Sequence, residues 1–241
     1  MKLTSLAKDL EPYIIKLIRK IVGEMQFAGI RTTTGLAYRL RLVDQSEREI
    51  AEYVVYALGG GEYADIYTVM LAAGAGDAIL VPVGTFQDWG DTGDGSTSDI
   101  SFVGQSRTNT IIDGNPYFAG GGGSIENMTL IESFSSAADI HSILLYGAGT
   151  VHLNDIHVEM TQTGTGDVQG ISAEHGSAII HVWNSYIKSN ASGAGAGYAA
   201  YAGYSGDEVH FHNCHLVYND AIEDPGGSGT VYLHGCTTET I

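Results

Sequence analysis

A short sequence pattern returns four times in the second half of the chain, and it constrains the fold more than any other feature. The pattern alternates apolar with polar residues, places Asn, Asp or Gly near its centre, and then resumes the alternation. The copies are VHLNDIHV (151–158), IHVWNSYI (180–187), VHFHNCHL (209–216) and VYLHGCTT (231–238). A unit that recurs at a nearly constant spacing indicates a solenoid, in which each unit packs on its neighbours.

The polar residue at the centre of the pattern sets the length of the repeat. With one earlier copy included, the aligned positions are Asn127, Asp155, Asn184, Asn213 and Gly235, which are 28, 29, 29 and 22 residues apart. A unit of this size is too short for a propeller blade and has no helical period, so it predicts an all-β fold, a parallel β-helix. We expect the central residue to bend the chain in a left-handed conformation, which Asn, Asp and Gly tolerate.

The alternation predicts which side chains face the core. In the copy at 151–158, Val151, Leu153, Ile156 and Val158 are predicted to point inward. Equivalent outward residues of successive coils lie about 4.8 Å apart in such a fold, so they form columns. The predicted columns are His152–His181–His210–Tyr232, Asn154–Trp183–His212–His234 and His157–Tyr186–His215–Thr237.

The histidine-rich columns have three interpretations. Neutral imidazoles are common zinc ligands, but no acid or cysteine joins the columns at the right rung, which argues against a metal site. In the second interpretation, the columns are a stacked aromatic and polar face that fits the pleated surface of the sheet and has no further role. We favour contact with another copy of this chain or with a glycan, with assembly that depends on pH near neutrality. The residues selected by this hypothesis are Trp89, His152, His181, His210, Tyr232, Trp183, Tyr198, Tyr201 and Tyr204.

The last three tyrosines belong to a glycine- and alanine-rich stretch, NASGAGAGYAAYAGYSGD (190–207). We expect this stretch to be a long loop that displays its tyrosines for adaptable contact. The alternative is a strand of small residues that packs on the β-helix.

One acidic stretch, DWGDTGDGSTSD (88–99), is a candidate calcium site. Calcium prefers six to eight oxygen ligands, which carboxylates and carbonyls supply. The candidate ligands are Asp88, Asp91, Asp94 and Asp99. The EF-hand spacing and its terminal Glu are absent, so we prefer a solvated loop tip here. We expect no other cofactor.

Residues 1–65 differ from the repeats in charge and in periodicity. Ile14, Ile18, Ile21 and Met25 form an apolar stripe that predicts a helix over 5–27, and the alternation at 35–43 predicts a strand. SERE (46–49) is typical of a capping box and predicts a second helix as far as Leu58. We therefore expect a small α-helical or mixed segment that anchors and oligomerises the chain, followed by a β-helix domain over 66–241.

Charge is distributed unevenly along the chain. Residues 1–50 hold nine of the eleven Lys and Arg residues against six acids, whereas residues 51–241 hold only Arg107 and Lys188 against 22 acids. The two nets, +3 and −20, sum to the formal charge of −17. A surface with this much negative charge repels nucleic acid and anionic membranes. We therefore expect neither of them as a partner. The same surface repels acidic polysaccharides. A polysaccharide lyase would have only Arg107 and Lys188 available as its catalytic base in this part of the chain.

The termini carry expectations about location and partners. The first residues lack the apolar core of a secretory signal, and no run approaches the ~20 apolar residues of a membrane span. We expect synthesis in the cytoplasm without a signal peptide. The last residues, CTTETI, contain no amphipathic cap, so we expect a neighbouring subunit or protein to cover the last coil.

The segments GDAILVPVGTF (76–86) and ISFVGQSRTNTIIDG (100–114), followed by repeated N-x-x-I coils, resemble the pectin-lyase-like superfamily of right-handed parallel β-helices. The likeness covers roughly residues 64–241. A short N-terminal segment before a β-helix also resembles bacteriophage tail spikes and virion surface proteins. The resemblance implies a non-enzymatic, homo-oligomeric component of a virion or extracellular surface, with a trimer favoured. The alternative that it implies is a carbohydrate-active enzyme, a polysaccharide lyase or glycoside hydrolase.

Overall fold

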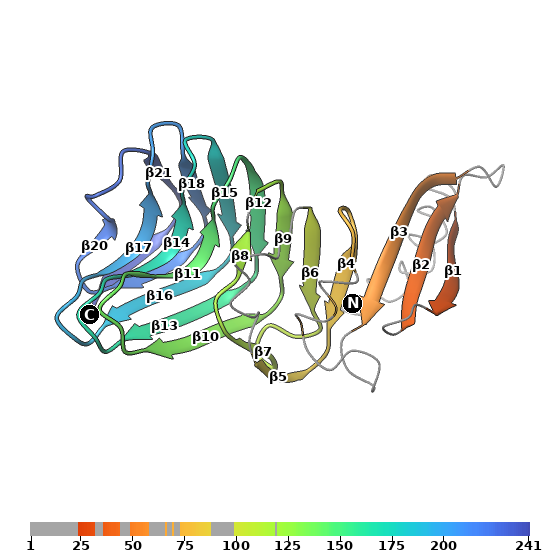
Figure 1. Cartoon of the computed structure of the whole chain (residues 1–241), viewed down its shortest axis with the longest axis horizontal. Coiled ribbons are helices and arrows are strands. Elements are labelled where there is room, and N and C mark those ends of the chain that lie inside the picture. The colour runs from red at the N-terminus through yellow and green to blue at the C-terminus, as the bar shows by residue number, and fades with distance from the viewer. Residues whose placement is uncertain are drawn as a thin grey trace, which may run out of the picture.

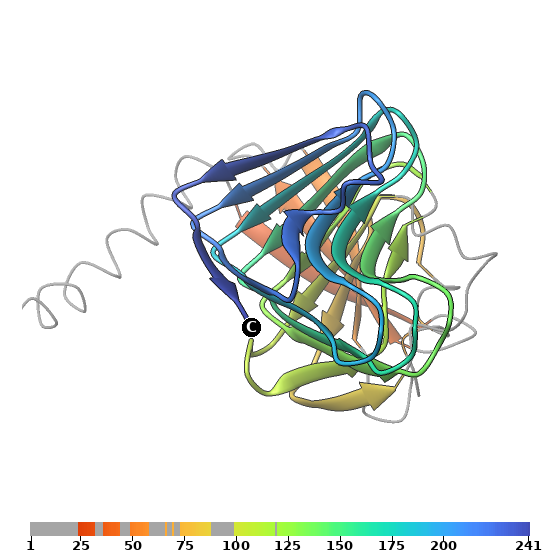
Figure 2. The same cartoon turned by 90° about the vertical axis from the view of Figure 1, so that its left-hand side faces the viewer.

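Three sheets of mostly parallel strands run side by side along the molecule and form a parallel β-helix (Figure 1). The computed structural model describes residues 24–31, 36–43, 49–57, 66, 69, 73–87, 99–118 and 120–241. Viewed from the C-terminal side, successive coils lie behind one another (Figure 2). The fold class predicted from the repeat is confirmed. None of the described residues belongs to a helix long and apolar enough to cross a membrane.

The strands of each sheet follow the order of the coils. The first sheet contains β1 (Glu24–Arg31), β2 (Leu36–Val43), β3 (Glu49–Ala57), β4 (Ala78–Val81), β6 (Ile100–Gly104), β9 (Gly123–Glu126), β12 (Gly149–Asn154), β15 (Ala178–Trp183), β18 (Glu208–His212) and β21 (Thr230–His234). The second sheet contains β5 (Gly84–Gln87), β7 (Thr110–Asp113), β10 (Thr129–Phe134), β13 (His157–Gln162), β16 (Tyr186–Ala191), β19 (His215–Tyr218) and β22 (Thr237–Thr240). The third sheet contains β8 (Tyr117–Phe118), β11 (Ile140–Leu145), β14 (Val168–Ala173), β17 (Gly197–Ala202) and β20 (Ala221–Glu223).

The core is a column of apolar side chains enclosed by the three sheets. In the coil that begins with β12, the inward residues predicted from the alternation are all fully buried. They are Val151, Leu153, Ile156 and Val158. Full burial of one such side chain contributes about 1.5–3 kcal/mol, so each coil with such a buried set adds a stabilising layer. The outward residues between them are therefore held at a regular spacing along the sheet.

In the last five coils, the bend between the first and second sheets contains one residue in the left-handed conformation. The φ angle is 56° at Asn127, 51° at Asp155 and Asn184, 54° at Asn213 and 66° at Gly235. These are the five positions aligned in the sequence, so the predicted left-handed bend is confirmed. Because these five bends have the same length, the strands on both of their sides keep the same register from coil to coil.

The N-terminal helices predicted from local sequence signals are wrong wherever the structure describes them. Strand β1 begins at Glu24, so the last four residues of the helix predicted over 5–27 are extended, and its earlier residues lie outside the described residues. The SERE helix is replaced by β3, which pairs antiparallel with β2 and parallel with β4. Val and Tyr favour strands, and β3 gains backbone hydrogen bonds on both sides, which a capping signal cannot match. The strand predicted at 35–43 is confirmed as β2.

The stretch at 190–207 is not a long loop. It contains β17, which pairs with β14 and β20, between two tight turns. Glycine is required in the first turn: a Cβ on Gly193 would lie 1.8 Å from the carbonyl oxygen of Gly164 one coil below, and a Cβ on Gly195 would lie 1.9 Å from that of Gly166. The small residues therefore allow neighbouring turns to stack closely, which corrects the loop prediction in favour of the packed strand.

Candidate functional site on the first sheet

Aromatic rings stack on the outward face of the first sheet in the columns predicted from the sequence. His152 pairs with His181, His181 with His210, and His210 with Tyr232 across four neighbouring strands. Their ring centroids are 5.6, 4.7 and 4.4 Å apart in that order. Cross-strand pairs of this kind are the units that stabilise a sheet face, at about 0.5–1.5 kcal/mol for each aromatic pair.

A parallel column lies two residues further along the same strands. Trp183 stacks on His212 at 5.4 Å, and His212 stacks on His234 at 4.6 Å. The two columns also contact each other, since the centroids of His181 and Trp183 are 5.3 Å apart. We name this continuous set the first ladder. Its members are His152, His181, Trp183, His210, His212, Tyr232 and His234.

The first ladder holds its imidazoles close to one another and mostly away from carboxylates. Burial lowers the pKa of His181, and the neighbouring imidazoles of His210, His152 and His212 lower it further. The pKa of His212 is lowered by burial and then by His234 and His210. A second proton on these rings would add a charge beside other imidazoles, so the neutral form is favoured.

Three members of the first ladder bring ring nitrogens together. One nitrogen each from His181, His210 and His212 lies within 4.8 Å of the other two. His181 Nδ1 and His212 Nε2 are buried and have no hydrogen-bond partner among the described residues. The remaining histidine has an acid beside it, because His210 Nε2 lies 2.7 Å from Glu208 Oε2. The sequence argument, in which no acid joins the columns, missed this contact.

A second ladder follows the outward face of the second sheet and consists of His157, Tyr186 and His215. The ring centroids of His157 and Tyr186 are 4.6 Å apart, and those of Tyr186 and His215 are 5.4 Å apart. The third predicted column, which ends at Thr237, is therefore also confirmed. His215 Nδ1 lies 2.7 Å from Thr237 Oγ1, so this ring has a hydroxyl partner in the next coil.

The three tyrosines predicted as contact residues in the stretch at 190–207 do not join either ladder. Tyr198 and Tyr201 belong to β17 of the third sheet, and Tyr204 lies in the turn that follows. Tyr198 is 6% exposed, whereas Tyr204 is 55% exposed. Burial is the first cause that raises the pKa of Tyr198, to about 12, with nearby Asp167 and Asp224 adding to the effect. Of the three, Tyr204 is the one with a largely accessible side chain.

The acidic candidate for calcium is described only at its last residue. Asp99 lies in a turn at a φ of 60°, and its Oδ1 accepts a hydrogen bond of 2.7 Å from the backbone N–H of Gly122. One carboxylate oxygen of Asp99 thus binds the backbone of a segment 23 residues further along the chain. The other candidates, Asp88, Asp91 and Asp94, lie outside the described residues, as does Trp89.

A polar cluster on the third sheet was not predicted. His141 Nδ1 lies 2.8 Å from Ser172 Oγ and 3.4 Å from Glu174 Oε1. Both contacts use the same ring nitrogen and Ser172 is fully buried, so this geometry does not make a nucleophile that a substrate can reach. Burial lowers the pKa of His141 and raises that of Glu174, and Asp207 adds to the second shift. No repeat in the sequence places these residues together.

Both basic residues of the β-helix are in ion pairs, and both cysteines are free thiols. Arg107 Nη1 lies 2.8 Å from Asp155 Oδ1, and Lys188 contacts Glu159 on the neighbouring strand. Cys214 is buried in the inward position that follows the bend, and burial raises its pKa to about 11. A thiol that resists ionisation is a poor nucleophile, and Cys214 packs as a small residue of the core.

Comparison with known proteins gives no relative for this chain. No protein-family model, no curated protein and no solved structure matches it. The function must therefore be argued from the site itself.

Proposed function

We propose that this chain is a non-enzymatic structural component of a virion or surface appendage, similar in role to a tail spike or a decoration protein. In this proposal the β-helix is a rigid body, and the first ladder is its contact surface for another copy of the chain or for a glycan. The observation that carries the proposal is the continuous stack of seven rings over four neighbouring strands of one sheet. Residues 1–65 would anchor and oligomerise the chain.

The orientation of the rings decides which groups such a surface contacts. Rings stacked face to face along a column cover one another's faces, so the ladder offers mainly ring edges to its surroundings. Imidazole and indole edges carry N–H groups, which donate hydrogen bonds to hydroxyl and carbonyl oxygens. With a formal net charge of −17, the chain repels acidic saccharides. Neutral glycans and a second copy of the chain are therefore the partners that suit the first ladder.

A binding experiment with two matched variants tests this function. The full chain is applied to an array of neutral and acidic glycans, and its mass is measured in solution against the 25.5 kDa of one chain. We expect a trimer, or retention on neutral glycans, and loss of either property in Trp183→Ala. Tyr186→Ala, which removes a ring from the second ladder, should behave like the unchanged chain.

Two outcomes would contradict the proposal. A monomer that binds no glycan on the array leaves the first ladder without a partner. Release of new reducing ends or unsaturated products from the glycans would instead favour the carbohydrate-active enzyme. The raised pKa of Glu174 is the observation that supports this alternative, since a general acid must keep its proton near neutral pH. Glu174→Gln would then abolish product release.

A further inference from the structure

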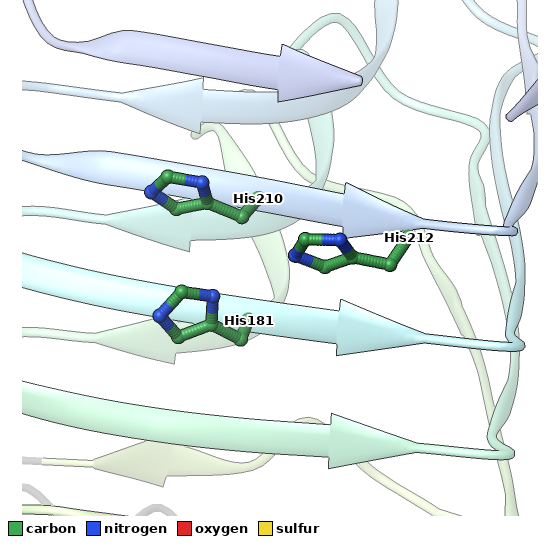
Figure 3. A group of neighbouring side chains, drawn as sticks. All are labelled: His181, His210 and His212. Atoms are coloured by element: carbon green, nitrogen blue, oxygen red, sulfur yellow. The ribbon is translucent and has the colours of Figure 1, made fainter. Parts of the chain in front are cut away.

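We propose that the first ladder contains a binding site for a divalent transition-metal ion, with His181, His210 and His212 as ligands and zinc as the ion that suits it. This inference does not depend on the proposed function. His210 and His212 are two residues apart on β18, so they project from the same face, and His181 pairs with His210 from β15. Figure 3 shows the three rings gathered on that face, with the ring of His212 directed toward the space beside the other two.

The spacing of the nitrogens is close to that of an occupied site. In a tetrahedral zinc site the metal–nitrogen distances of 2.0–2.1 Å place ligand nitrogens about 3.3 Å apart. Here the three nitrogens lie within 4.8 Å of one another, so they must approach by about 1.5 Å or less. All three side chains are partly exposed, which leaves room for small rotations about their side-chain bonds. The planes of His181 and His210 already differ by 28°, so their stack is not a rigid parallel one.

Two of the three histidines carry a ring nitrogen without a hydrogen-bond partner in the described part of the chain. His181 Nδ1 and His212 Nε2 are buried without a hydrogen-bond partner among the described residues. A buried polar atom without a partner costs about 1–3 kcal/mol, and such atoms call for a bound water, ion or ligand. An ion between these nitrogens would satisfy both.

The third histidine has the acid partner that metal-binding imidazoles usually have. His210 Nε2 lies 2.7 Å from Glu208 Oε2. When Nε2 carries the ring proton and donates a hydrogen bond to the carboxylate, Nδ1 of the neutral ring has a lone pair that can bind the metal. Such an acid orients the ring and increases its basicity, and its loss typically weakens metal binding by 10–100-fold.

The chemistry of the donors selects the class of ion. Three imidazole nitrogens suit zinc, copper, nickel and cobalt, whereas calcium and magnesium require oxygen ligands. Three protein ligands leave the fourth tetrahedral position of zinc open to water or to a group from a bound molecule. The acidic chain also attracts cations to its surface.

Calorimetric titration of the full chain, prepared without any added histidine tag, with zinc chloride tests this proposal. We expect saturable binding of one ion per chain at neutral pH. His212→Gln and His181→Gln should each weaken binding by at least tenfold, and Glu208→Gln by roughly 10–100-fold. Titration with cobalt provides a second measurement, because tetrahedral coordination by nitrogen gives visible absorption bands. The Glu208→Gln variant should show the same bands, but only at higher cobalt concentrations.

The control is His215→Gln in the second ladder, which removes a stacked imidazole that lies outside the cluster. This variant should bind zinc as the unchanged chain does. Absence of saturable binding by the unchanged chain would overturn the proposal, and so would equal losses in His215→Gln and His212→Gln. Circular dichroism of each variant shows whether the β-helix is retained. If a ligand variant fails to fold, the test rests on Glu208→Gln, which is an isosteric change outside the ligand set. Weaker zinc binding by this variant supports the proposal, and unchanged binding contradicts it.

Discussion

The two ladders share their stacking but differ in the partners of their ring nitrogens. In the second ladder, His157 Nε2 lies 3.6 Å from Glu159 Oε2, and His215 Nε2 lies 3.6 Å from Glu239 Oε2. In the first ladder the neighbours of an imidazole are mostly other rings, and two buried nitrogens have no partner among the described residues. The same repeat thus produces one face on which an acid lies beside each described histidine, and another on which His210 alone has such an acid and two nitrogens have no partner among the described residues.

This difference shows that a column of histidines does not by itself define a site. Stacking is set by the register, which is identical on both sides of the bend. For His157 and His181 the chemistry is set by the residue two positions further along the strand, which projects from the same face. That residue is an acid for His157 and a tryptophan for His181. Substitutions that affect both ladders therefore test the fold that they share. Substitutions that affect one ladder alone test the chemistry of that ladder.

The largest expected effect comes from the core that both ladders share. Phe211 is fully buried beneath the first ladder, between His210 and His212 in sequence. Phe211→Ala should lower the free energy of unfolding by about 3–5 kcal/mol, because it removes buried apolar surface and leaves a cavity. Urea denaturation followed by circular dichroism measures this loss. Tyr232→Ala, an exposed ring of the same ladder, is the control and should cost about 1 kcal/mol or less.

A smaller effect is expected at the bend that separates the ladders. Asn184 joins β15 to β16 at a φ of 51°. Asn184→Ala should destabilise the protein by about 1–2 kcal/mol, because a Cβ-bearing residue without a polar side chain is strained in this conformation. Asn184→Gly lacks the strain and should cost less than Asn184→Ala in the same urea titration. Equal costs for the two variants would mean that backbone strain does not determine the choice of residue at the bend.

Sequence reasoning recovered the features that repeat and missed those that do not. The apolar alternation and the one-residue bend were visible in each copy, so the core of the coil at 151–158 and all three columns follow from them. Strand β17 was given only as the alternative to a loop, because Gly and Ala show no inward–outward contrast in GYAAYA. Strand β3 was missed because its hydrogen-bond partners lie in β2 and β4, which no local signal in SERE reveals.

The candidate site was predicted at the level of columns and not at the level of atoms. Register places His181 beside His210, but the approach of their nitrogens depends on side-chain rotation, which a sequence pattern does not contain. The same is true of Glu208, which alternation places on the outward face with His210 without predicting that the two side chains meet. The cluster around His141 joins different coils through contacts that follow no repeat.

The smallest expected effect is beside the second ladder, at the ion pair of Lys188 and Glu159. The hydrogen bond from Lys188 lowers the pKa of Glu159, so the folded state favours the ionised carboxylate. Its contribution is present above the ordinary glutamate pKa and is lost as the pH falls through the lowered pKa of the folded state. Both side chains are partly exposed, at 26% for Lys188 and 39% for Glu159, so solvent screens the pair.

Lys188→Gln should therefore reduce the free energy of unfolding at neutral pH by only about 0.2–1 kcal/mol. The loss should shrink at about 1 M salt, which screens exposed charges, and near about pH 3, where glutamate gains its proton. Glu159→Gln should show the same dependence, and the double variant should cost less than the sum of the two single changes. A loss that is the same at both pH values would mean that Lys188 acts through the packing of its aliphatic chain rather than through charge.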